Sequence, residues 1–171
     1  MAYEDINIGD VVNIADIDWI VLDKRERAAL CLTKDFIYER KIFDNRTNDY
    51  ENSSIRRELN TNFLQRIIGA VGERSVLNAK IDLTSEDGLD DYGFVVDKVG
   101  LLTADMYRVY NRVIERHPIN RWWWLATPWS TPHRVYDYSV CCVNVSGTLG
   151  CGNCCNDFGV RPFCIFSSSI F

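Results

Sequence analysis

Cysteine is the residue type in this chain whose spacing first indicates chemistry. Seven cysteines occur, and six of them follow residue 140. Cys151 and Cys154 have the Cys-x-x-Cys spacing of zinc ligands, with Cys155, Cys141 and Cys142 nearby in the sequence. A strong zinc signal would add a second Cys-x-x-Cys or a histidine pair, because adjacent cysteines cannot easily point at one ion. We therefore predict no metal and no cofactor. A structural zinc-binding domain and a disulfide between nearby cysteines stay open as alternatives.

Nucleophilic catalysis would require a base beside one of these thiols. The chain has two histidines: His117 precedes a proline, and His133 lies in the region that leads to the cysteines. A Cys-His pair also needs a carboxylate that orients the histidine, and no spacing here indicates one. The sequence has no glycine-rich phosphate loop, no Gly-x-Ser-x-Gly and no His-Glu-x-x-His. We predict that the protein is not an enzyme.

The segment that holds these residues has an unusual composition. Residues 130–160 contain no Lys, Glu, Gln, Met or Trp, although these five types make up 21 of the first 129 residues. The residue types that do occur can each be written by a codon ending in a pyrimidine, whereas the five missing types cannot. A template rich in Asn codons whose adenines are replaced at random would give this list. Our hypothesis is that residues 129–158 form a variable segment.

Within that segment we separate scaffold from variable positions. Val143, Val145, Gly147 and Leu149 are the expected scaffold, since the valines and the leucine alternate as in a strand. Tyr, Ser, Gly and Asn are abundant in binding loops, where tyrosine gives contact area and small polar residues adapt their hydrogen bonds. The predicted ligand-binding positions are Trp129, Ser130, His133, Arg134, Tyr136, Asp137, Tyr138, Cys141, Cys142, Asn144, Gly150, Cys151, Asn153, Cys154, Cys155, Asn156 and Asp157.

Several motifs resemble a bacterial and phage domain family. They are Trp-Trp-Leu-x-x-Pro at 123–128, Val-x-x-x-Gly at 143–147, Gly-Val-Arg-Pro at 159–162, Ser-Ile-Arg-Arg-Glu-Leu-Asn-x-x-Phe at 54–63 and Val-Gly-Leu-Leu-Thr at 99–103. That family is related to the formylglycine-generating-enzyme branch of the C-type lectin fold. Some members are variable proteins of diversity-generating retroelements, which rewrite a C-terminal segment to alter ligand specificity.

The resemblance implies a receptor-type protein with a fixed scaffold and exchangeable side chains. A formylglycine-generating-enzyme-like enzyme is a further alternative, although no catalytic cysteine motif of those relatives can be placed here. Sugar binding through calcium would need the Trp-Asn-Asp of many C-type lectins, which is absent; Asn156-Asp157 is a partial match. We expect an unidentified protein or surface polymer as the ligand, because many exposed side chains suit an extended partner.

Hydrophobic patterns predict the elements that position this segment. Runs rich in β-branched and aromatic residues predict strands at 10–14, 19–22, 28–33, 76–83, 98–102, 122–125 and 160–165, and polar stretches predict loops at 44–52 and 84–93. A serine at 53 or 54 caps a predicted helix over 54–68, and Thr103 caps a second that ends at His117. The expected fold class is α+β and C-type-lectin-like, with two helices packed on short antiparallel sheets.

Length and charge limit the remaining classes. A chain of 171 residues predicts one domain over 1–171. A net charge of −5 argues against nucleic acid as a partner. No apolar run reaches membrane-spanning length, and the chain as written has no signal peptide. We therefore expect a cytoplasmic protein without a membrane partner. Incorporation into a phage particle or display on a surface is compatible with this expectation. We interpret Arg161 as a structural residue. Its half-buried charge requires a carboxylate or backbone carbonyls to offset the cost of desolvation.

Overall fold

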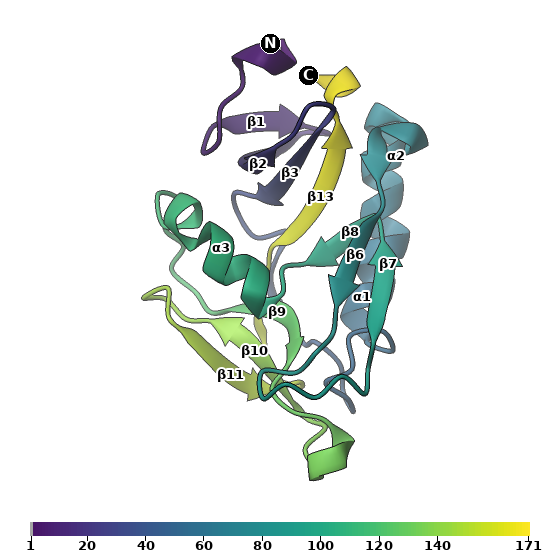
Figure 1. The fold of residues 1–171 in the computed structure, drawn as a ribbon, viewed down its shortest axis with the longest axis vertical. Coiled ribbons are helices and arrows are strands. Elements are labelled where there is room, and N and C mark those ends of the chain that lie inside the picture. Colours follow the sequence, from purple (N-terminus) through teal and green to yellow (C-terminus); the bar gives the residue numbers. More distant parts are fainter. Residues whose placement is uncertain (1) are drawn as a thin grey trace.

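The first of two large sheets lies at the end of the molecule that carries both termini (Figure 1). The structure is a computed structural model, and it describes residues 2–171. The strand order is β1-β2-β3-β13-β5, and β8 also pairs with β13. Ala15 and Asp16, each with a φ of 58°, join β1 to β2 in a two-residue turn whose positive φ values match the strand twist. The strands are β1 Val11–Ile14, β2 Ile17–Lys24, β3 Ala28–Thr33, β5 Val76–Leu77, β8 Val99–Leu101 and β13 Pro162–Ser167.

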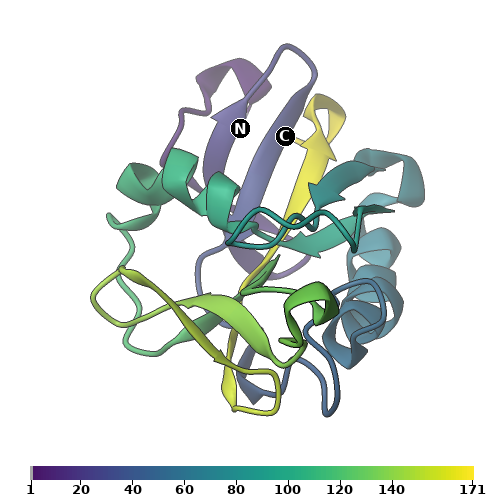
Figure 2. The same ribbon diagram turned by 60° about the horizontal axis from the view of Figure 1, so that its bottom comes forward.

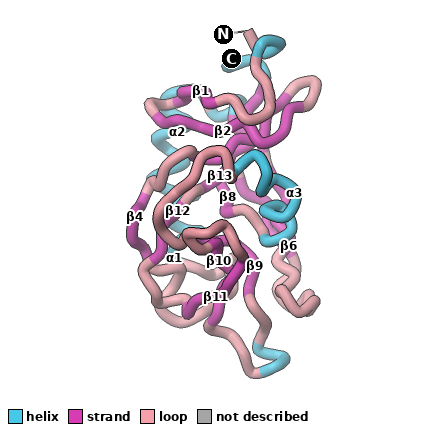
Figure 3. The backbone as a smooth tube through the Cα atoms, turned by 90° about the vertical axis from the view of Figure 1, so that its left-hand side faces the viewer, coloured by secondary structure: helices cyan, strands magenta, loops and turns pink. Residues whose placement is uncertain are grey.

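The second large sheet lies at the opposite end and contains most of the unusual segment. Its order is β11-β10-β9-β12-β4, with β12 parallel to β9 and the other pairs antiparallel. All six residues of the central strand β9 are buried, as expected of a strand covered on both faces. Figure 3 shows β4 and β12 on the side away from α3. The strands are β4 Tyr38–Lys41, β9 Trp123–Pro128, β10 Ser139–Val143, β11 Leu149–Asn153 and β12 Phe158–Val160.

A two-stranded sheet and the helices pack around these layers. Ser53 caps α1 by accepting from the backbone N–H of Arg56, and Thr103 caps α3 by accepting from that of Met106. Gly72, with a φ of 84°, ends α2. The elements are β6 Ala79–Asp82, β7 Phe94–Asp97, α1 Ser54–Glu58, a π-helical turn Leu59–Phe63, α2 Leu64–Val71, α3 Ala104–Ile114, and 3-10 turns at Tyr3–Asp5, Glu73–Ser75, Pro132–Arg134 and Ser168–Ile170.

Buried aromatic pairs connect the sheets to their surroundings. In the first sheet, the Trp19 ring meets the Phe166 ring edge to face with centroids 5.0 Å apart. In the second, Trp124 packs on Phe43 at 5.7 Å. Each such pair adds about 0.5–1.5 kcal/mol beyond the burial of its area.

The expected fold class is wrong. Strands in three sheets dominate the described chain, and one of the sheets contains a parallel pair. The expected α+β, C-type-lectin-like arrangement of two helices on short antiparallel sheets therefore does not describe this fold. α3 is the one helix of regular form and length. The segment expected as the other helix is divided into α1, a π-helical turn and α2. Side-chain periodicity does not distinguish a continuous α-helix from one that a π-helical turn interrupts.

Several predicted elements are confirmed with shifted bounds. The first three strands, the helix after Thr103 and the central tryptophan strand are present. Trp122, however, lies before β9 and is 38% exposed, so it is not a core residue. The closing strand predicted over 160–165 is interrupted at Arg161, because β12 ends at Val160 and β13 begins at Pro162. As expected, backbone carbonyls accept hydrogen bonds from this arginine. Within residues 2–171, no helix combines the length and hydrophobicity needed to cross a membrane.

Candidate functional site

Two loops of the unusual segment meet at the end of the molecule opposite the termini (Figure 1). Segment 129–138 joins β9 to β10, and segment 153–157 leads from the end of β11 to β12. The backbone N–H of Cys154 donates to the carbonyl of Tyr138 at 2.7 Å, which joins the two segments. Their exposed or half-buried side chains form what we call the loop surface: Trp129, Pro132, His133, Arg134, Val135, Tyr136, Asp137, Tyr138, Asn153, Cys155, Asn156 and Asp157.

A fully buried asparagine outside the segment holds the backbone of the first loop. Asn48 Nδ2 donates to the carbonyls of Ser130 and Ser139, both at 2.9 Å, and the Tyr136 carbonyl lies 3.5 Å away. The backbone N–H of Asn48 donates to the carbonyl of Asp137 at 2.9 Å. Figure 2 shows the loop that contains Asn48 beside segment 129–138. Every one of these acceptors is a main-chain atom, so the contacts do not depend on the side chains of the segment.

Carboxylates of the loop 84–93 hold the other side of the same segment. Asp87 accepts from the Ser130 hydroxyl at 2.8 Å and lies 3.1 Å from Arg134 Nε. A hydrogen bond from Ser85, a second from Ser130 and the charge of Arg134 lower the pKa of Asp87. Asp91 accepts a hydrogen bond from Thr131. These contacts involve side chains at two predicted variable positions, so changes at those positions would weaken this second anchor.

The apex of the loop surface combines an exposed apolar side chain with a strained backbone. Val135 is 87% exposed, and its φ of 56° and ψ of 40° place a β-branched residue in the left-handed region. Beside it, the rings of Tyr136 and Tyr138 stack with centroids 4.5 Å apart. A hydrogen bond with Tyr136 raises the pKa of Tyr138. The surface therefore offers aromatic, charged and apolar groups together.

Four of the predicted positions are buried and are therefore not part of the loop surface. Ser130, Cys141, Cys142 and Cys154 expose at most 5% of their surface, so they contact no ligand in this conformation. β10 is paired on both sides by β9 and β11, and all five of its residues are buried. Burial raises the pKa of Cys142 to about 12 and raises that of Cys141 further, so these thiols are poor nucleophiles.

The remaining predicted positions belong to the β10–β11 hairpin rather than to the loops. Gly150 and Cys151 are half-buried in the edge strand β11, where Cys151 pairs across the strands with Cys141. Asn144 lies in the turn at the opposite end of the hairpin from the loop surface. Its Oδ1 accepts from the backbone N–H of Ser146 at 2.9 Å. This bond closes the turn, and Asn144 is therefore not brought together with the loop residues.

The alternatives based on metal or on histidine gain no geometric support. In the part of the chain that the structure describes, no group of three or more His, Cys, Asp and Glu side chains could hold a metal ion. His133 is exposed at the loop surface, and His117 Nε2 lies 3.2 Å from the carbonyl of Gly9.

Sequence reasoning missed the residues that anchor the loops. Asn48, Asp87 and Asp91 lie in stretches that were interpreted only as polar loops, and their contacts reach across 40 to 91 positions of the chain. A buried asparagine inside a polar loop has no periodic signal. Segment 84–93 contains four acidic residues in two pairs, but nothing in the local sequence indicates that two of them bind Ser130 and Thr131.

Comparison with known proteins gives one match. Residues 102–168 match a family described as Domain of unknown function (DUF6273). The matched range begins at the residue that follows β8 and contains α3, β13 and every strand of the second sheet except β4, and thus includes the predicted variable segment. No curated protein and no solved structure matches the chain.

Proposed function

We propose that this protein is a ligand-binding protein whose residues 129–158 are diversified by adenine-directed mutagenesis, as in the variable proteins of diversity-generating retroelements. The protein binds and does not catalyse. The loop surface makes the contacts, and the remaining chain fixes the backbone that carries it. Two independent features support the proposal: the missing residue types in 130–160, and the way in which the loop is anchored.

The observation that carries the proposal is the set of bonds made by Asn48. A receptor that exchanges side chains needs a loop whose conformation does not depend on them. The hydrogen bonds from Asn48 to the carbonyls of Ser130 and Ser139 meet that need because every residue type supplies the same acceptor. Affinity then changes with side-chain identity while the cost of ordering the loop stays constant.

The chemistry of the loop surface favours a protein or a surface polymer as the ligand. Trp129 and Tyr138 are 37% and 41% exposed, and tyrosine and tryptophan are enriched where proteins bind one another. Arg134 and Asp157 add charges of both signs within the same two segments. We place the protein in the cytoplasm during synthesis and on a phage particle or a displayed surface when it meets its ligand.

The nucleotide sequence beside the gene tests the proposal directly. We expect a near-identical copy of the DNA for residues 129–158 next to a reverse transcriptase gene, with differences confined to adenines of the copy. Positions that differ should include His133, Tyr136 and Cys155, whereas the codons of Val143 and Gly147 should agree. Differences spread over all four bases, or the lack of any copy in the complete genome, would refute diversification.

A further inference from the structure

Two pairs of cysteines lie directly opposite each other on neighbouring strands. Cys141 of β10 is paired with Cys151 of β11, and Cys31 of β3 is paired with Cys164 of β13. All four are free thiols in this structure. Directly opposite residues of an antiparallel pair project to the same face of the sheet, so each pair brings its two thiols together. Whether a pair can form a disulfide then depends on its place in the hydrogen-bond pattern of the strands.

Hydrogen bonds at both ends of the β10–β11 hairpin define the place of the first pair. The backbone N–H of Cys154 donates to the carbonyl of Tyr138 at 2.7 Å, and that of Asn144 donates to the carbonyl of Thr148 at 3.0 Å. Hydrogen-bonded and non-hydrogen-bonded pairs alternate along an antiparallel ladder, and the cysteine pair lies three positions from each of these bonds. It is therefore a non-hydrogen-bonded pair, the class in which Cα atoms are only about 4.5 Å apart.

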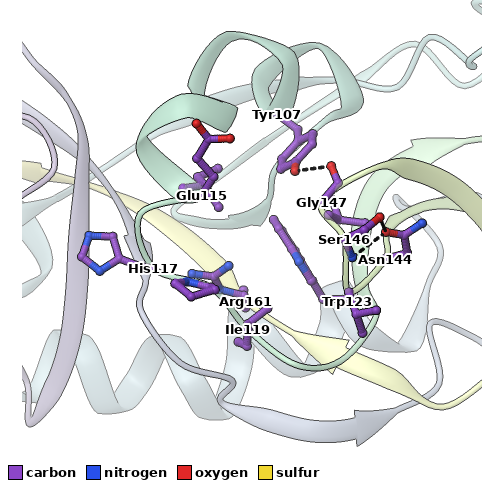
Figure 4. A pocket seen from close by; sticks show the side chains of 13 residues that line it. Tyr107, Glu115, His117, Ile119, Trp123, Asn144, Ser146, Gly147 and Arg161 are labelled. Carbon is purple, nitrogen blue, oxygen red and sulfur yellow. Dashed lines mark hydrogen bonds between the residues drawn. The ribbon is translucent and has the colours of Figure 1, made fainter.

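The turn of this hairpin fixes the register on which that geometry depends. The Tyr107 hydroxyl donates to the carbonyl of Gly147 at 2.6 Å, and Figure 4 shows the ring of Tyr107 reaching down from α3 to the turn. Asn144 Oδ1 accepts from the backbone N–H of Ser146 at 2.9 Å. A slip of β10 past β11 by one residue would break these bonds and separate the cysteine pair.

The spacing of the first pair is close to that of a disulfide. Cβ atoms joined by a disulfide are about 3.5–4.5 Å apart. Directly opposite Cβ atoms in a ladder are about 4.5–5.5 Å apart, and they are closest in non-hydrogen-bonded pairs. Cys141 and Cys151 therefore need only a small approach, which an edge strand such as β11 permits because it is held on one side only.

The second pair has a less favourable geometry and serves as an internal comparison. The backbone N–H of Ser168 donates to the carbonyl of Arg27 at 2.9 Å, four positions from the pair Cys31–Cys164 along the β3–β13 ladder. This pair is therefore hydrogen-bonded, with Cα atoms about 5.5 Å apart. Both of its residues are fully buried. We expect it to stay reduced, because its Cβ atoms are about 1 Å further apart and no oxidant reaches either sulfur.

Access also differs between the two thiols of the first pair. Cys151 is half-buried in β11, whereas Cys141 is 2% exposed and its Sγ lies 3.9 Å from Glu86 Oε2. Burial, followed by the charge of Glu86 and the two neighbouring thiols, raises the pKa of Cys141. An oxidant therefore has to reach only Cys151, and Cys141 then reacts within the protein.

We propose that Cys141 and Cys151 form a disulfide when the protein meets a small-molecule disulfide such as oxidised glutathione. The Cys151 thiolate attacks one sulfur of the glutathione disulfide, forms a mixed disulfide and releases one glutathione thiolate. The Cys141 thiolate then attacks Sγ of Cys151 and releases the second glutathione. The two protons of the protein thiols end on the two reduced glutathione molecules. The raised pKa of Cys141 makes the second step slow at neutral pH and faster as the pH rises.

The disulfide attaches the exposed edge of the second sheet to its interior. It holds β11 just before segment 153–157, which carries part of the loop surface. Under the proposed function both cysteines are variable positions, so the bridge is a property of this variant of the segment. The assignment itself rests on the strand register and does not depend on the proposed function.

Counting free thiols by mass spectrometry tests the proposal. The protein is equilibrated with oxidised and reduced glutathione at mildly alkaline pH, and in a second arm it is refolded from urea in the same mixture, so that burial of Cys141 cannot prevent the reaction. It is then denatured and labelled with a maleimide. The reduced protein should take up seven labels, and the oxidised protein should take up two fewer without added glutathione mass. A mixed disulfide at Cys155 removes one label and adds that mass, so the two products are distinguished.

Three variants identify the pair. Cys151→Ser and Cys141→Ala should show no loss of two labels, and Cys151→Ser, at a half-buried position, keeps the test valid if Cys141→Ala does not fold. Cys155→Ser is the matched control, because Cys155 is exposed and outside the pair, and it should still lose two labels. Oxidation closes a loop of 11 residues, so it should raise the Tm of the unaltered protein by about 5–10 °C and leave that of Cys151→Ser unchanged.

Three results would overturn the proposal. The first is a full set of labels, or glutathione adducts alone, in both arms of the experiment. The second is a bridge that persists in Cys151→Ser or in Cys141→Ala, since another cysteine would then be the partner. The third is a bridge between Cys31 and Cys164 in place of the proposed one, which would show that the hydrogen-bond pattern does not decide which pair reacts.

Discussion

Replacing Asn48 by alanine should destabilise the protein by about 3 kcal/mol. The change removes two hydrogen bonds of 2.9 Å from Nδ2 to the carbonyls of Ser130 and Ser139, and one of 2.8 Å that Oδ1 accepts from the Tyr92 hydroxyl. Each buried hydrogen bond contributes about 1 kcal/mol net, and unpaired carbonyls left behind add to the loss. For a chain of this length, such a loss lowers Tm by about 6–12 °C.

Urea unfolding of the Asn48→Ala variant measures this effect. We expect a lower midpoint with an unchanged slope, which reports a change in stability without a change in the surface exposed on unfolding. Asn156→Ala is the matched control, since Asn156 is exposed and the removal of its side chain should change the free energy of unfolding by less than about 0.5 kcal/mol. Asp137→Ala should behave like the control, because Asn48 bonds only the carbonyl of that residue.

A small effect would refute the reasoning about the anchor. A single ordinary hydrogen bond contributes about 1 kcal/mol. If Asn48→Ala lowers the free energy of unfolding by less than that, then water or other groups replace the asparagine, and Asn48 does not set the loop conformation. A loss for Asp137→Ala as large as that for Asn48→Ala would show that the loop depends on its own side chains. Either result removes the structural support for exchangeable side chains.

Three further predictions concern packing, thiol reactivity and pH. Gly159→Ala should destabilise the protein by about 1–3 kcal/mol in thermal unfolding, because the added Cβ would lie 2.2 Å from the Phe36 ring. Gly69 lies in a helix and an added Cβ there would have no atom within 4 Å, so Gly69→Ala should stabilise the protein by about 0.5–1 kcal/mol. Equal effects of the two changes would contradict the packing argument. Cys155, the exposed thiol, should react with a disulfide reagent far faster than the buried ones, and Cys155→Ser should abolish the fast phase seen by mass spectrometry. The lowered pKa of Asp87 contributes stability that is fully present above its unfolded value of about 3.9 and is lost as the pH falls through its folded pKa. Asp87→Asn should flatten that acid limb in urea titrations, and an unchanged limb would show that Asp87 does not stabilise the fold.

Local patterns predicted those parts of the fold that depend on local chemistry. The hairpin of β1 and β2 and the capped α3 follow from residues close together in the sequence. β4, with the sequence Tyr-Glu-Arg-Lys, was missed because an exposed edge strand has no apolar alternation. Cys141 and Cys142 of β10 were interpreted as variable positions, although the short apolar run Ser-Val-Cys-Cys-Val is typical of a strand buried on both faces.

The candidate site was only partly predictable, because part of it depends on contacts between residues far apart in the sequence. Exposed positions of the two loops follow from turn-forming residues and composition, so their place at the surface could be inferred. Which cysteines point inward depends on the pairing of β10 between β9 and β11, which no local pattern reveals. The anchoring role of Asn48 depends on contacts with residues 82 to 91 positions later.

The passage from β12 to β13 through one residue has a mechanical consequence. Because Arg161 alone separates the two strands and bonds the backbone at the end of β3, the sheets share one nearly continuous run of chain. The two ends of the molecule therefore cannot swing against each other as hinged lobes without breaking those bonds. Under the proposed function, a pulling force on a bound ligand would pass along this run into the strands beside both termini, and the protein would carry the load as a single rigid unit.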